Sequence, residues 1–150
     1  MAEKGLTDKL YEDQKLASKA KDRFRLSVIR MLRAELQNSA IEKRAPLEAD
    51  EELAILSREV KKRQESLGDY KRAGRQDLVD DLHKEIEILQ EYLPEQLSEE
   101  ELEKMVEEAI AATGAGSKKA MGKVMGLIMP KVKGKADGNT VRRIVEDKLE

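Results

Sequence analysis

Cysteine and tryptophan are absent from this chain of 150 residues, and histidine occurs once. Without cysteine there can be no disulfide bond or thiolate metal site, and one histidine is too few for the usual zinc sites or a Cys–His pair. The charged start of the sequence lacks the apolar segment of a signal peptide. No run approaches the roughly 18 apolar residues that a membrane helix needs. We therefore expect a cytoplasmic protein with no membrane-spanning segment and no metal site.

The patterns that mark common catalytic and nucleotide-binding sites are also missing. Neither GxxxxGK[ST] nor GxGxxG occurs, and Ser57, Ser66 and Ser98 lack the G-x-S-x-G context of a nucleophile. We expect His83, on the flank of an apolar stripe, to be a boundary residue whose ring has a partner. Carboxylates are abundant, but they fall where helix starts or polar faces favour negative charge. We predict that the chain has no catalytic centre and no cofactor of its own.

Helical spacing dominates what is present. Charged residues make up 40% of the chain and aromatic residues 3%, so the core must be aliphatic. Phe24, Val28, Met31, Leu32 and Leu36 share one face of a helix with 3.6 residues per turn. Similar stripes predict four helices with short connections, a pattern typical of a bundle. They cover roughly residues 7–20, 22–43, 50–72 and 77–92.

Arg63 interrupts the apolar seam of the third of these helices, and we expect its charged head to extend past the edge of the seam.

A domain boundary is expected at Pro94, which ends one helix. Ser98 opens the next helix, with Glu101 at the capping-box spacing. A further helix is predicted from an N-cap at Ser117 to a stop before Pro130, and a last one begins at Asp137 or Asn139. We therefore predict an all-α protein with a helical bundle domain at 1–96 and a small three-helix domain at 97–150.

Basic residues concentrate near the end of the chain. Between residues 117 and 145, eight bases stand against one acid, a local charge of +7 in a chain whose total is −2. Such a segment has the electrostatic outline expected for binding a phosphate backbone, although solvated surface is the simpler alternative. The shortage of aromatic residues argues against base stacking and favours contact with shape and phosphates. The candidate nucleic-acid-binding residues are Lys119, Lys123, Lys131, Lys133, Lys135, Arg142 and Arg143.

A weaker basic patch is expected on the second helix, opposite its apolar face. It comprises Arg23, Arg30, Arg33 and Gln37.

Several longer motifs resemble those of the YqeY family, and together they span essentially the whole chain. They are Leu26-Ser-Val-Ile-Arg-Met-Leu-Arg33, Asp50-Glu-Glu-Leu53, Glu91-Tyr-Leu-Pro-Glu-Gln-Leu97, Met121-Gly-Lys-Val-Met125 and the stretch from Met129 to Gly138. The last third of the chain also resembles the tail domain of the B subunit of glutamine-dependent aminoacyl-tRNA amidotransferase, a carbon–nitrogen ligase. Asp137-Gly138 replaces the Asn-Pro that this tail domain favours, which still allows a helix to start there.

The resemblance implies a tRNA-binding accessory role rather than catalysis. In the amidotransferase the tail domain contacts the outer corner of tRNA, while the chemistry takes place in other domains and another subunit. YqeY-like domains also occur attached to glutaminyl-tRNA synthetase. The resemblance thus implies tRNA as partner, contacted through its backbone, with an amidotransferase or an aminoacyl-tRNA synthetase as a second partner.

The alternative is a helical protein–protein interaction module that binds no nucleic acid. Its support is Leu26, expected to be exposed on the basic side of the second helix, and a stripe of Met121, Met125 and Met129 at helical spacing. Methionines at this spacing more often belong to a core than to an interface.

Overall fold

The computed structural model describes residues 5–114 and 116–149. Within these ranges the chain is all-α: it contains seven α-helices, one short 3-10 helix and no strand. Its backbone contacts divide it into two compact units, Met1–Leu93 and Pro94–Glu150, referred to as unit 1 and unit 2. In the ranges described, every helix is too short or too polar to cross a membrane.

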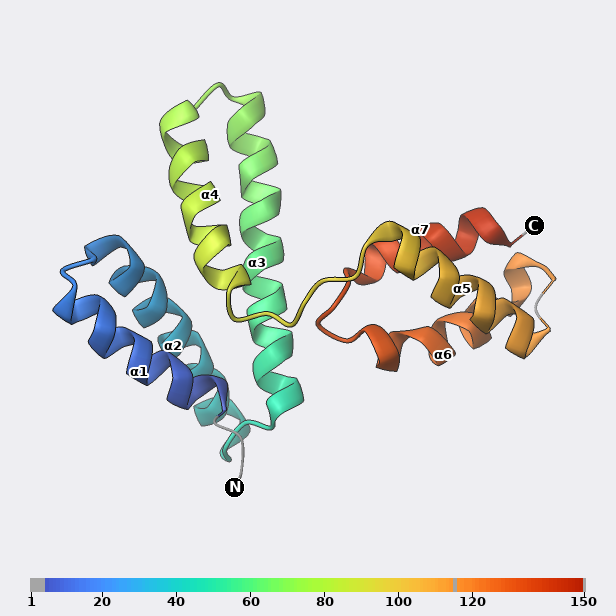
Figure 1. Cartoon of the computed structure of the whole chain (residues 1–150), viewed down its shortest axis with the longest axis horizontal. Coiled ribbons are helices and arrows are strands. Elements are labelled where there is room, and N and C mark those ends of the chain that lie inside the picture. The colour runs from blue at the N-terminus through green and yellow to red at the C-terminus, as the bar shows by residue number, and fades with distance from the viewer. Residues whose placement is uncertain (1–4, 115, 150) are drawn as a thin grey trace. The chain divides into compact units, whose positions relative to one another are not determined.

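Unit 1 is built from two helical hairpins (Figure 1). The first pairs α1 (Leu6–Lys19) with α2 (Arg23–Lys43), and the second pairs α3 (Ala49–Arg72) with α4 (Gln76–Gln90). Helix α2 contacts both helices of the second hairpin. The four helices expected from the apolar stripes are therefore all present, arranged as two hairpins that share one core.

The core of unit 1 is aliphatic, as the composition requires. Val28, Leu32 and Leu36 of α2 are buried as expected, while Phe24 and Met31 pack against the core only partly buried. Each fully buried aliphatic side chain contributes about 1.5–3 kcal/mol. The remaining buried members of this core are Leu10, Ala17, Ile29, Ile55, Leu56, Val60, Ile86, Ile88 and Leu89.

Unit 2 contains α5 (Glu99–Thr113), a 3-10 turn η1 (Lys118–Ala120), α6 (Met121–Val132) and α7 (Gly138–Lys148). The predicted capping box at the start of α5 is confirmed: the Glu101 N–H donates to Ser98 Oγ at 3.2 Å, and the Ser98 N–H donates to the Glu101 carboxylate at 2.9 Å. Asp137 occupies the N-cap position of α7, as expected. The buried core is Leu102, Val106, Ala109, Val124, Ile128, Val132, Val141, Ile144, Val145 and Leu149.

The sixth helix differs from the prediction at both ends. Ser117 precedes the 3-10 turn instead of capping an α-helix, and α6 begins only at Met121. At the other end Pro130 lies inside the helix, which continues to Val132. Proline removes one helical hydrogen bond, but Pro130 is on the exposed side, where water can solvate the carbonyl of Gly126. The additional turn is stabilised because it buries the side chain of Val132 completely.

The expectation for Arg63 is also wrong. Its side chain is only 15% exposed and its guanidinium turns inward to Glu59, which is 3% exposed. It donates to the Glu59 carboxylate at 2.8 Å and to the Met31 sulfur at 3.4 Å, and its Nε lies 3.4 Å from Glu85 Oε2. A buried carboxylate needs such a partner because burial removes its hydration. Arg63 thus links α3 to α4 by its ion pair with Glu85 and to α2 by its hydrogen bond to Met31.

Candidate nucleic-acid interface

The seven candidate residues all lie in unit 2, and all are exposed. Lys119 is on η1, Lys123 and Lys131 are on α6, and Lys133 and Lys135 are in the segment 133–137 that joins α6 to α7, here called the lysine loop. Arg142 and Arg143 follow on α7.

The exposed side of α6 combines two glycines with one exposed leucine, Leu127, which is 37% exposed. The face opposite to buried Val124 and Ile128 carries Lys123 beside Gly122 and Gly126. Lys131 instead flanks the buried face and borders a small cavity that Glu108 of α5 also lines. A Cβ atom added at either glycine would meet nothing within 4 Å. Neither glycine is therefore required by packing within the chain, although glycine inside a helix costs about 0.5–1 kcal/mol relative to alanine. The backbone on this face is open to close approach from outside.

The lysine loop is held by defined backbone contacts. Gly134 has φ +75°, a left-handed conformation that favours glycine. The Lys135 N–H donates to the Val132 carbonyl at 2.8 Å. From the segment before α5, the Leu97 N–H donates to the Lys135 carbonyl at 2.9 Å and Gln96 Nε2 donates to the Gly134 carbonyl at 2.8 Å. The loop therefore has a fixed backbone, and Lys133 and Lys135 are both exposed on it.

The two arginines have acidic partners. Arg142 lies 3.5 Å from Glu146 one turn along α7, and Arg143 pairs with Glu99 at the start of α5. Both arginine side chains stay more than half exposed. Exposed pairs of this kind are worth at most about 1 kcal/mol, so a phosphate group can compete for either arginine.

Most basic residues of unit 2 follow α5 in the sequence, and two of them, Arg143 and Lys148, pair with glutamates of α5. Helix α5 has Lys104 as its single base, against six glutamates. The basic residues lie on the elements that follow α5. The glutamates of α5 are Glu99, Glu100, Glu101, Glu103, Glu107 and Glu108.

The weaker basic patch expected on α2 does not form a uniform cationic surface. Arg23 and Arg30 are exposed. Arg33 is partly buried: it donates to the Gln14 side chain and lies with Cζ 5.1 Å from the centre of the Tyr11 ring. The expected patch is therefore divided between solvent and contacts with α1.

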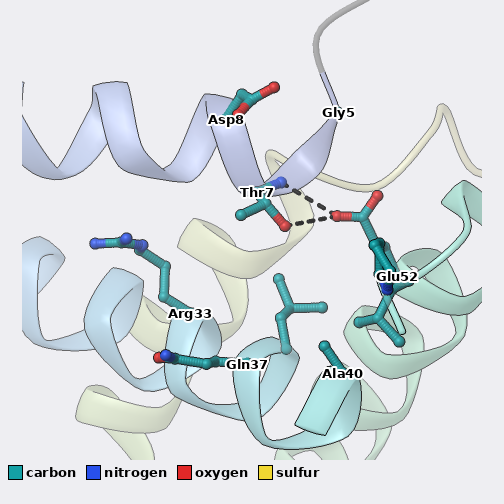
Figure 2. A pocket seen from close by; sticks show the side chains of 10 residues that line it. Gly5, Thr7, Asp8, Arg33, Gln37, Ala40 and Glu52 are labelled. Carbon is teal, nitrogen blue, oxygen red and sulfur yellow. Dashed lines mark hydrogen bonds between the residues drawn. The ribbon is translucent and has the colours of Figure 1, made fainter. Parts of the chain in front are cut away.

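Arg33 and Gln37 border a cavity of about 550 Å³ between α1, α2 and the start of α3 (Figure 2). On its opposite wall the buried Glu52 of α3 accepts hydrogen bonds from the Thr7 N–H at 3.2 Å and from Thr7 Oγ1 at 2.8 Å. The first N–H groups of a helix have no partner within it, so Glu52 acts as a cap that α3 supplies to α1. Glu52 lies in the motif at 50–53, but its burial is a tertiary effect that helical spacing could not indicate.

The motif at 91–97 also has internal partners. Arg25 donates to both carboxylate oxygens of Glu91, at 2.6 and 3.1 Å, and these hydrogen bonds lower the pKa of Glu91. The Tyr92 hydroxyl donates to Asp13 Oδ2 at 2.5 Å, and burial together with the Asp13 charge raises the pKa of Tyr92. These contacts attach the end of α4 to the first hairpin.

The described residues contain no cluster of three or more histidine, cysteine, aspartate or glutamate side chains that could hold a metal ion. His83 does not lie at a core boundary as expected; it is exposed on α4.

The family model of Yqey-like proteins (YqeY) matches residues 7–149, nearly the whole chain. A search of curated proteins gives no match. The chain therefore belongs to the YqeY-like family, which confirms the resemblance that its motifs carry.

Proposed function

We propose that this YqeY-family chain is a non-catalytic, tRNA-binding accessory module that works beside a glutamine-dependent aminoacyl-tRNA amidotransferase or a glutaminyl-tRNA synthetase. Its unit 2 contacts the phosphate backbone of tRNA through the exposed side of α6, the lysine loop and the start of α7. Recognition depends on shape and charge and is the same for different tRNA sequences.

The observation that carries this proposal is the concentration of exposed bases in the part of unit 2 that follows α5. The acidic residues of α5 lie on one helix, whereas all seven candidate bases are exposed on the elements that follow it. Phosphate contacts by lysine and arginine supply most sequence-independent affinity for nucleic acids. The lack of side chains at Gly122 and Gly126 supports the same assignment, because a polyanion can come close to the α6 backbone beside Lys123.

A titration with total tRNA at several salt concentrations tests the proposal. Each phosphate contact releases counterions, so the logarithm of affinity falls with the logarithm of salt concentration by about 0.7–0.9 per contact. Replacing Lys131, Lys133 and Lys135 together by glutamine should weaken binding to all tRNAs alike and flatten this slope by about two to three units. The triple variant should remain folded, because exposed lysines add little stability.

A matched control is the triple glutamine variant of Lys19, Lys71 and Lys84, which are exposed on unit 1. It makes the same change in net charge and should leave both affinity and slope near those of the original chain. Equal losses in the two variants would mean that net charge alone drives binding, and the proposed face would be wrong. Absence of tRNA binding in the original chain would overturn the function itself.

The two features that supported a protein-interaction module are both packed against a core; Leu26 was expected to be exposed, whereas a core position is the commoner one for a methionine stripe. Leu26 is partly buried against the core of unit 1, and the stripe of Met121, Met125 and Met129 packs partly buried on the core of unit 2. If the titration shows no binding of tRNA, the protein-interaction module becomes the better interpretation.

A further inference from the structure

The lysine loop is braced by the segment that precedes α5. Gln96 Nε2 donates to two carbonyl oxygens, that of Pro94 at 2.9 Å and that of Gly134 at 2.8 Å. The next residue, Leu97, donates its N–H to the Lys135 carbonyl at 2.9 Å. Two consecutive carbonyl groups of the loop are thus occupied by donors from residues about 38 positions away in the sequence.

This arrangement favours binding of an anion by the loop. A free carbonyl oxygen carries partial negative charge and repels a phosphate group, and a loop that turns freely exposes such oxygens part of the time. Here the carbonyls of Gly134 and Lys135 are turned toward their donors, which leaves the side chains of Lys133 and Lys135 as the groups that meet solvent. Fixing the backbone in advance also lowers the entropy lost on binding.

We propose that Gln96 is a positioning residue for the lysine loop, and that binding of an RNA backbone to the loop stabilises the hydrogen bonds made by Gln96 and Leu97. This proposal rests on the tRNA-binding function proposed above. Gln96 itself adds no charge and makes no contact with RNA; it acts by holding the loop in the form that binds phosphate.

The variant Gln96→Ala tests this role because it removes the donor without changing the number of cations. Loss of one hydrogen bond that holds the loop should weaken tRNA binding about three- to tenfold. The salt dependence should keep the slope of the original chain, unlike that of the lysine variants. The matched control is Gln64→Ala at an exposed position of α3, which should leave the affinity for tRNA unchanged.

Coupling must also act in the reverse direction, since linkage between two equilibria is reciprocal. Saturating tRNA should therefore slow hydrogen exchange of the Leu97 amide in the original chain. The amide of Val106, in the middle of α5, reports whether unit 2 as a whole has been affected by the variant.

The outcomes separate the two proposals. If the original chain binds tRNA with the expected salt slope, but Gln96→Ala binds equally well and the Leu97 amide is not protected, the brace is irrelevant to binding and this inference is overturned. If Gln96→Ala flattens the salt slope, Gln96 acts on the number of phosphate contacts and its assigned role is wrong. If the original chain binds no tRNA, both proposals fall together.

Discussion

Replacing Gly126 by alanine should make unit 2 more stable and its binding of tRNA weaker. Gly126 lies inside α6 on the outward face, and an added Cβ would meet nothing within 4 Å. Alanine is favoured over glycine within helices by about 0.8–1.0 kcal/mol, and no packing term opposes this gain. For a domain of this size the change corresponds to a rise in Tm of about 4–8 °C.

Two measurements on the full chain check the prediction. The stability of unit 2 is measured by hydrogen exchange of its most protected amides, such as that of Val124, and tRNA affinity by titration at fixed salt. The matched control is Gly68→Ala on α3, where the added Cβ would be in ordinary contact, 3.6 Å from the Arg72 side chain. The control should stabilise unit 1 by a similar amount and leave tRNA affinity unchanged.

Opposite signs for stability and affinity in Gly126→Ala would be hard to obtain from a general disturbance of the fold. If stability does not rise, the outward face of α6 is not open as described. If stability rises and affinity stays the same, RNA does not approach α6 closely, and the interface is restricted to the lysine loop and α7.

Further predictions concern particular contacts and the absence of turnover. Ser98→Ala removes the capping box of α5 and should cost about 1 kcal/mol of unfolding free energy, measured by urea denaturation. Glu91→Gln should cost less than about 1 kcal/mol near neutral pH, because its pair with Arg25 is half exposed. Since the folded chain lowers the pKa of Glu91, this contribution is present above pH 4.5 and is lost as pH falls through the lower folded value, so the two stability curves should converge in acid. Arg63→Ala leaves the buried Glu59 with Lys62, 3.6 Å away, as its remaining cation and should cost about 1–3 kcal/mol in the same denaturation assay, whereas Arg63→Lys should recover part of the loss. The purified chain should neither hydrolyse ATP nor release ammonia from glutamine above background, and turnover that survives further purification would contradict the non-catalytic assignment.

Features governed by near neighbours in the sequence were predictable from the sequence. The capping box at Ser98 and Glu101 depends on residues three positions apart, and its hydrogen bonds form as expected. The stripe through Val28, Leu32 and Leu36 places these residues in the core because helical spacing alone brings them to one face.

Features governed by distant residues were not predictable in this way. Pro130 indicates a helix end locally, but burial of Val132 in the core extends α6 by a further turn. Arg63 turns inward because it pairs with Glu59 and with Glu85 of α4. The apolar pattern of α3 alone cannot indicate a partner on another helix. The candidate binding residues are all exposed, but the pairing of Arg143 with Glu99 and the brace at Gln96 depend on the tertiary fold.

The motifs that carry the family resemblance therefore support the proposed function unequally. In the motifs at 50–53 and 91–97, Glu52, Glu91 and Tyr92 have partners within unit 1 that account for them by the stability of the fold. The motif at 121–125 is different, because Gly122 lies on an open face where an alanine would fit without any contact. A glycine here costs helix stability and contacts no neighbour among the described residues, and the proposed close approach of tRNA gives a reason for it. The proposal of tRNA binding therefore depends on the outward face of α6 and on the lysine loop. The motifs at 50–53 and 91–97 are accounted for by their contribution to the fold of unit 1.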